Sequence, residues 1–136
     1  MRFSNAICAA VMATATSAVR VSWDGGYNEA GRSMGVVSCS DGSHGLMNRY
    51  PTQGNLPNYP FIGGTDAIGG WGSGQCGTCW QLEYQGHKIK ILAIDHAASG
   101  FNINPVAMDA LTNGRAYELG RVDATVTQLS ARDCGL

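Results

Sequence analysis

The sequence carries little charge of either sign and has no run of basic residues. Charged residues make up 14% of the 136 positions, with nine Lys and Arg against ten Asp and Glu, for a net charge of −1. Proteins that bind nucleic acids rely on clustered Lys and Arg to neutralise phosphates. The composition therefore gives no reason to expect a nucleic-acid partner.

Long apolar runs are also missing. The apolar run at residues 6–15 is shorter than the roughly 20 residues that cross a bilayer, and no other stretch is a candidate. It follows Arg2 and precedes the small residues Thr16-Ser17-Ala18, which is the pattern of a secretory signal peptide. We predict a signal peptide at residues 1–18 and one secreted domain at residues 19–136, with a buried N-terminal helix as the alternative for the apolar run.

Cysteine is scarce, and removal of the leader would also remove Cys8. Four cysteines remain: Cys39, Cys76, Cys79 and Cys134. An even count in a secreted chain predicts two disulfides, for which three pairings are possible. A Cys76–Cys79 bridge would close a very small loop, whereas bridges across long loops stabilise more. We therefore expect Cys76 and Cys79 each to bond a distant partner.

Two other uses of the Cys-x-x-Cys pair are less consistent with its surroundings. A redox pair is typical of a helix N-terminus, but glycines precede Cys76 and a predicted strand follows it. A zinc site would need knuckle-like spacing of Cys and His, which His44, His87 and His96 do not provide. We predict neither a metal nor a cofactor.

Alternation of apolar and polar residues predicts several short strands, at residues 19–23, 35–40, 78–84, 88–94 and 122–127. Gln85-Gly86 is typical of a hairpin turn between two of them. Residues 45–50 could form one helical turn, whereas residues 52–74 show no periodicity and are predicted to lack regular structure. Short strands with few helices favour a closed β-barrel, because closure leaves no strand edge exposed.

A corner near residue 95 is the candidate functional site. The apolar strand at residues 89–94 ends at Asp95, which we expect to be exposed, and a loop of small residues leads to Gly100. Asn102 then alternates with Phe101 and should point outward, and Asn104-Pro105 is a good start for a helix over residues 105–111. An acid and an amide beside a glycine loop could contact a sugar. The alternative is a structural corner in which the Asp caps a turn.

The chain after residue 18 resembles the cerato-platanins, a family of small secreted fungal proteins related to expansins. The matching segments run in family order: Ser33-Met34-Gly35, Cys39-Ser40, His44-Gly45-Leu46-Met47, Tyr50-Pro51-Thr52, Cys76-Gly77-Thr78-Cys79-Trp80, Gly100-Phe101-Asn102, Asn104-Pro105 and Gly120-Arg121-Val122. The resemblance implies a mainly β fold with short helices, a six-stranded double-psi β-barrel, and the pairings Cys39–Cys76 and Cys79–Cys134. It also implies secretion to the fungal wall or beyond, elicitor activity towards plants and expansin-like wall loosening.

The same resemblance implies that N-acetylglucosamine oligomers of chitin bind in a shallow groove, with cellulose surfaces as a further partner. Asp95 and Asn102 match the family's acid and the polar residue after Gly-Phe. We predict a carbohydrate site of Asp95, Asn102, Gly100 and Trp71. Tyr27 and Trp23 are further candidates for stacking on a sugar, and Trp80 fits core packing better. The family pattern changes at Trp23, where relatives often have Tyr, and at residues 96–99, which form a local insert.

Two other functions compete with simple binding. An inverting glycoside hydrolase would need two carboxyl groups, but Asn102 is an amide where hydrolytic relatives carry an acid, and the sequence does not place Asp66 near Asp95. We therefore predict no catalytic residue and no enzyme activity. A monomer that self-assembles into films at interfaces would need a large exposed apolar patch. The mean hydropathy of −0.08 does not demand such a patch.

Overall fold

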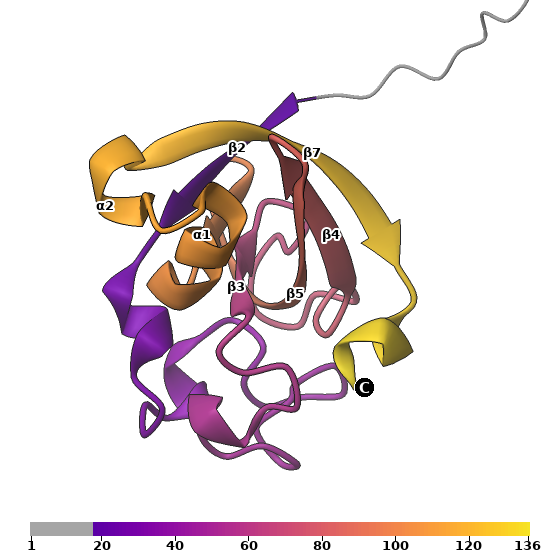
Figure 1. Ribbon diagram of the computed structural model, residues 1–136. Helices are drawn as coiled ribbons and strands as arrows, with labels where there is room; N and C mark the ends of the chain where they lie inside the picture. Colours follow the sequence, from indigo (N-terminus) through magenta and orange to yellow (C-terminus); the bar gives the residue numbers. More distant parts are fainter. Residues whose placement is uncertain (1–17) are drawn as a thin grey trace, which may run out of the picture.

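The computed structural model describes residues 18–136, so residues 1–17 of the predicted leader, including Cys8, lie outside the described part. Six strands close into a mixed barrel in the order β2-β6-β3-β5-β4-β7 (Figure 1). Their bounds are β2 Ala18–Trp23, β3 Ile62–Thr65, β4 Cys79–Tyr84, β5 His87–His96, β6 Phe101–Ile103 and β7 Arg121–Leu129. The predicted six-stranded barrel is confirmed.

Two local predictions follow from side-chain chemistry and are also confirmed. Gln85 and Gly86 both have positive φ, 49° and 83°, as a two-residue hairpin turn between β4 and β5 requires. Asn104 caps helix α1, Pro105–Thr112, by accepting a hydrogen bond from the Val106 amide at 2.7 Å. The short helix α2, Ala116–Leu119, follows and leads into β7.

The prediction that residues 52–74 lack regular structure is wrong, because β3 lies within them and pairs with both β5 and β6. Glycine has low strand propensity, which hides a strand containing Gly63-Gly64 from pattern analysis. The close approach of β6 explains why residue 63 is a glycine. A Cβ atom there would lie 2.6 Å from the Asn102 carbonyl oxygen and 2.8 Å from the Ile103 Cα.

The predicted strand at residues 35–40 is also wrong. Met34–Val36 form a 3₁₀ turn, which Ser33 caps by accepting a hydrogen bond from the Gly35 amide at 3.0 Å. The segment beyond it is irregular but anchored, since the Cys39 amide donates to the Ile94 carbonyl at 3.1 Å. The helical turn predicted at residues 45–50 is present, with the Tyr50 amide donating to the Leu46 carbonyl at 2.9 Å.

The buried side chains form two clusters within the one domain. The helix-side core packs β2, β4 and β6 against α1 and includes Val21, Leu82, Phe101, Met108 and Leu111. The loop-side core lies beneath the irregular segments and includes Met34, Leu46, Ile62, Ile68 and Ile94. Two disulfides, Cys39–Cys76 and Cys79–Cys134, border the loop-side core in the pairing that the resemblance implies. Within residues 18–136, no helix is long and apolar enough to span a bilayer.

Candidate functional site

Four residues from four strands align in one row across the outer face of the barrel. β3 places Gly64 opposite Asp95 of β5 on one side and opposite Asn102 of β6 on the other. β2 then places Ser22 opposite Asn102. Because Asp95 and Asn102 are two strand spacings apart, their Cα atoms are separated by about 10 Å. The structure thus brings the predicted acid and amide together, with a glycine between them.

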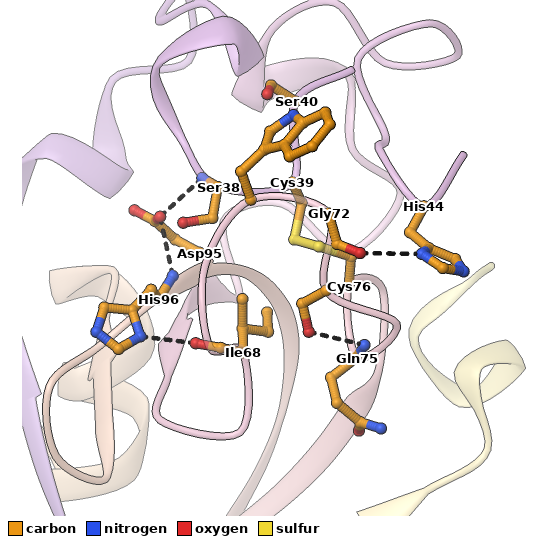
Figure 2. Close-up of a disulfide and its surroundings, with 12 residues drawn as sticks. Ser38, Cys39, Ser40, His44, Ile68, Gly72, Gln75, Cys76, Asp95 and His96 are labelled. Carbon is orange, nitrogen blue, oxygen red and sulfur yellow. Dashed lines mark hydrogen bonds between the residues drawn. A yellow bond between two sulfur atoms is a disulfide. The ribbon is translucent and has the colours of Figure 1, made fainter. Parts of the chain in front are cut away.

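Asp95 is half-buried, and the expectation of an exposed carboxylate is wrong. Its Oδ1 accepts hydrogen bonds from the Ser38 and His96 amides, each at 2.9 Å, and Figure 2 shows both. Its Oδ2 accepts the Tyr27 hydroxyl at 2.8 Å. A carboxylate offers about four acceptor positions, so three are used internally and about one is left for a ligand. Asp95 therefore fixes the surrounding backbone as well as offering charge.

Tyr27, a candidate for stacking on a sugar by its sequence, instead completes the Asp95 end of the row through its hydroxyl. It lies in the 3₁₀ turn Gly25–Asn28 and is 5% exposed. Its hydroxyl fills the space above Gly64, since a Cβ atom on Gly64 would lie 3.2 Å from it. Burial, followed by the negative charge of Asp95, raises the pKa of the Tyr27 phenol far above its ordinary value. Tyr27 therefore stays a hydrogen-bond donor, and no signal near it in the sequence identifies Asp95 as its partner.

Asn102 forms the other end of the row. Its Oδ1 accepts a hydrogen bond from the Ser22 hydroxyl at 3.0 Å. The side chain is half-buried, and no acceptor from the described residues is bonded to its Nδ2. An amide with an available N–H group suits recognition of a carbonyl or hydroxyl oxygen.

Gly100 lies next to this row, where β6 begins. Its φ is +62°, and a Cβ atom would overlap the Arg20 carbonyl, so only glycine fits. Its amide donates to Asp66 Oδ2 at 2.9 Å, which places Asp66 beside the site and gives it a structural role. A shallow depression of about 280 Å³ opens here, lined by Ala18, Val19, Arg20, Asp66, Ser99, Gly100 and Asp123.

Trp71 presents an aromatic surface on the neighbouring loop. The side chain is 65% exposed, although its indole N–H donates to Asp41 Oδ1 at 2.6 Å. This hydrogen bond holds the pKa of the Asp41 carboxyl below its ordinary value. Asp41 lies three residues after Ser38, the partner of Asp95, and three extended residues span at most about 10 Å. Trp71 is therefore linked to the Asp95 end of the row by a short segment.

The other aromatic and titratable candidates lie outside this arrangement. The His96 ring donates to the Ile68 carbonyl at 2.7 Å, so the imidazole does not pair with Asp95 (Figure 2). Trp80 packs edge-on against Phe101, with ring centroids 5.7 Å apart, as expected of a core residue. Trp23 instead stacks on Tyr117. Among residues 18–136, no group of three or more Cys, His, Asp or Glu could hold a metal.

Comparisons with known proteins agree on one family. The family model described as Cerato-platanin matches residues 19–136. The protein named Allergen Asp f 15, from Aspergillus fumigatus, is 49% identical over 116 residues, which cover 85% of this chain and 76% of the allergen.

Solved structures give the same result. The crystal structure of cerato-platanin 2 from M. perniciosa has a TM-score of 0.85 and 44% identity, covering 88% of this chain and all of that one. The solution structure of the fungal elicitor Cerato-Platanin has a TM-score of 0.79 and 43% identity, covering 85% of this chain and 96% of that one.

Proposed function

The chain belongs to the cerato-platanin family, and from that premise we propose that it is a secreted protein that binds N-acetylglucosamine oligomers of chitin without hydrolysing them. The observation that carries the proposal is the row in which Asp95 and Asn102 flank Gly64 on the outer face of the barrel. The same premise supports secretion and elicitor activity, because one similar structure is that of a fungal elicitor.

The chemistry of the row matches an N-acetylated sugar. Asp95 retains about one acceptor position for a hydroxyl, and Asn102 offers an N–H group to the acetamide carbonyl. Trp71, whose indole N–H donates a hydrogen bond to Asp41, offers an exposed ring on which a pyranose could stack. Cellulose presents similar ring faces but no acetamide, so we expect the chitin oligomer to bind more tightly.

Hydrolysis is not supported by the same geometry. Asn102 cannot act as a general acid, and Asp66 Oδ2 is occupied as the acceptor of the Gly100 amide. We expect purified protein to release no reducing ends from chitin or cellulose. Turnover that is lost on replacing Asp66 or Asp95 would contradict this expectation.

A titration followed by NMR tests the binding site directly. N-acetylglucosamine oligomers of increasing length should shift the signals of Asp95, Gly100, Asn102 and the Trp71 indole, with a Kd between about 1 μM and 1 mM because the site is shallow. Asn102→Ala should weaken binding roughly fivefold by removing one uncharged hydrogen bond. Asp133→Ala, an exposed carboxylate in the C-terminal 3₁₀ turn, is the matched control. Shifts confined to other surfaces, such as that around Tyr117, would refute the site.

A self-assembling coat protein remains the second candidate in this family, together with wall loosening. The exposed large apolar side chains Val36, Trp71, Val106 and Tyr117 are divided between the loops and the two helices. Since films require a contiguous apolar surface, this distribution favours the soluble binder.

A further inference from the structure

Two loops beside the binding row are joined to each other at three points. We call residues 38–45 and 66–76 the paired loops. The Cys39–Cys76 disulfide is the covalent link between them. The Trp71 indole donates to Asp41 at 2.6 Å, and His44 Nδ1 lies 3.1 Å from the Gly72 carbonyl, within hydrogen-bond distance. Figure 2 shows the disulfide with His44 and Gly72 beside it.

The paired loops are also fixed to the end of β5. The Ser38 amide donates to Asp95 and the Cys39 amide donates to the Ile94 carbonyl. On the other loop, the Ile68 carbonyl accepts the His96 ring. One loop thus holds the carboxylate and the other carries the aromatic ring, so the spacing of Asp95 and Trp71 depends on how the loops are joined.

We propose that the Cys39–Cys76 disulfide positions Asp95 and Trp71 for sugar binding, whereas the Cys79–Cys134 disulfide stabilises the fold alone. The second bridge joins the start of β4 to the 3₁₀ turn Ala131–Cys134, and neither segment contacts Asp95 or Trp71 through a described hydrogen bond. This inference rests on the proposed function, since it assigns a role within the same site.

The noncovalent links between the paired loops are too exposed to replace the disulfide. Asp41, His44, Trp71 and Gly72 are all exposed, so water competes for their hydrogen bonds. Gly70 and Gly72, with φ of 156° and 83°, give the backbone around Trp71 a large conformational entropy to lose. The covalent link holds the Cys76 end of this glycine-rich segment against Cys39, and so restricts the positions open to the ring.

The test compares two double variants, Cys39→Ser with Cys76→Ser and Cys79→Ser with Cys134→Ser, at a temperature where barrel amide signals show that both are folded. The first should bind N-acetylglucosamine oligomers at least tenfold more weakly than the native chain. Its Trp71 indole and Ser38 amide signals should move to the positions of solvent-bonded groups. The second should keep both signals and bind within twofold of the native chain. Equal losses of affinity in the two variants, or native signals and affinity in the first, would overturn the proposal.

The same spectra distinguish a failure of this inference from a failure of the proposed function. If the native chain binds no oligomer, the proposed function fails, and the Trp71 and Ser38 signals alone decide whether the Cys39–Cys76 bridge positions these groups. Unchanged signals in the first variant would then overturn the inference.

A second set of variants tests whether the position of the Trp71 ring matters for binding, with both disulfides intact. Asp41→Ala removes the acceptor of the Trp71 indole at an exposed position, so it should weaken binding about fivefold without unfolding the barrel. Asp41→Asn keeps an acceptor oxygen and should restore most of the affinity. Equal binding by both variants and the native chain would show that the ring needs no positioning.

Discussion

The helix-side core and the loop-side core are equally well buried but are enclosed by different kinds of backbone. Regular strands and α1 enclose the helix-side core, where alternation and capping specify each element. The loop-side core is covered by short turns, which are held by side-chain-to-backbone hydrogen bonds and two disulfides. The contrast teaches that the proposed binding side chains depend on irregular backbone even where a regular strand carries them, since loop contacts fix both Asp95 of β5 and Trp71.

The largest expected effect comes from removing a covalent link of the loop-side core. Replacing Cys79 and Cys134 by Ser should lower the free energy of unfolding by about 4 kcal/mol, because the unfolded chain regains the entropy of a long loop. The bridge spans a sequence separation of 55 residues. Denaturant unfolding of the variant and the native chain would measure the difference. A loss under 1 kcal/mol would mean that the loop-side core does not depend on this link.

A somewhat smaller loss of stability is expected from a substitution in β3. Gly63→Ala should destabilise the fold by about 3 kcal/mol, since the added methyl group collides with the β6 backbone. Gly69→Ala is the matched control, because nothing lies within 4 Å of its Cβ position. Thermal unfolding of both would sharpen the comparison, and a tolerated Gly63→Ala would show that β3 can move away from β6.

Asp95→Ala tests the junction between the loops and the barrel. The substitution removes the carboxylate that accepts hydrogen bonds from the Tyr27 hydroxyl and from two backbone amides. Because these donors lose their partner, we expect the free energy of unfolding to fall by about 2 kcal/mol. Asp133→Ala should change stability by less than about 0.5 kcal/mol, as exposed positions usually do. Chemical denaturation of both variants measures this, and equal stabilities would contradict a structural role for Asp95.

The smallest effect concerns the Tyr27 hydroxyl. Tyr27→Phe should cost about 1 kcal/mol at pH 7. The folded protein holds the Tyr27 proton more tightly than the unfolded chain, so the stability from this group is complete below pH 10 and falls as pH rises above it. Stability curves measured between pH 7 and 11 should therefore converge above pH 10 for the variant and the native chain. A constant difference across this range would refute the raised pKa.

The sequence predicted those parts of the fold that depend on neighbouring residues. The β4–β5 turn is set by Gln85-Gly86, and the start of α1 is set by Asn104 and Pro105, so both are visible in local patterns. Pattern analysis misses β3 because Gly63 makes room for the β6 backbone, and Gly64 for the Tyr27 hydroxyl and two β5 carbonyl oxygens, and these are tertiary requirements.

The candidate site was predictable in part for the same reason. Asp95 and Asn102 were identified from their place around one loop, and the register across Gly64 brings them together. The bond from Tyr27 to Asp95 joins residues 68 positions apart, and no local pattern encodes it. The burial of Asp95 was therefore mistaken for exposure, because its partners come from distant turns.

The closed barrel has a consequence for the order in which the chain can fold. β2 pairs with β7, so Ala18 meets Thr125, roughly 100 residues away, and contacts this distant form slowly. The β4–β5 hairpin and α1 are local and can form early. A chain that ended before β7 would leave β2 and β4 each with an unpaired edge, open to pairing with other chains. The last strand synthesised is thus the one that protects the protein from aggregation.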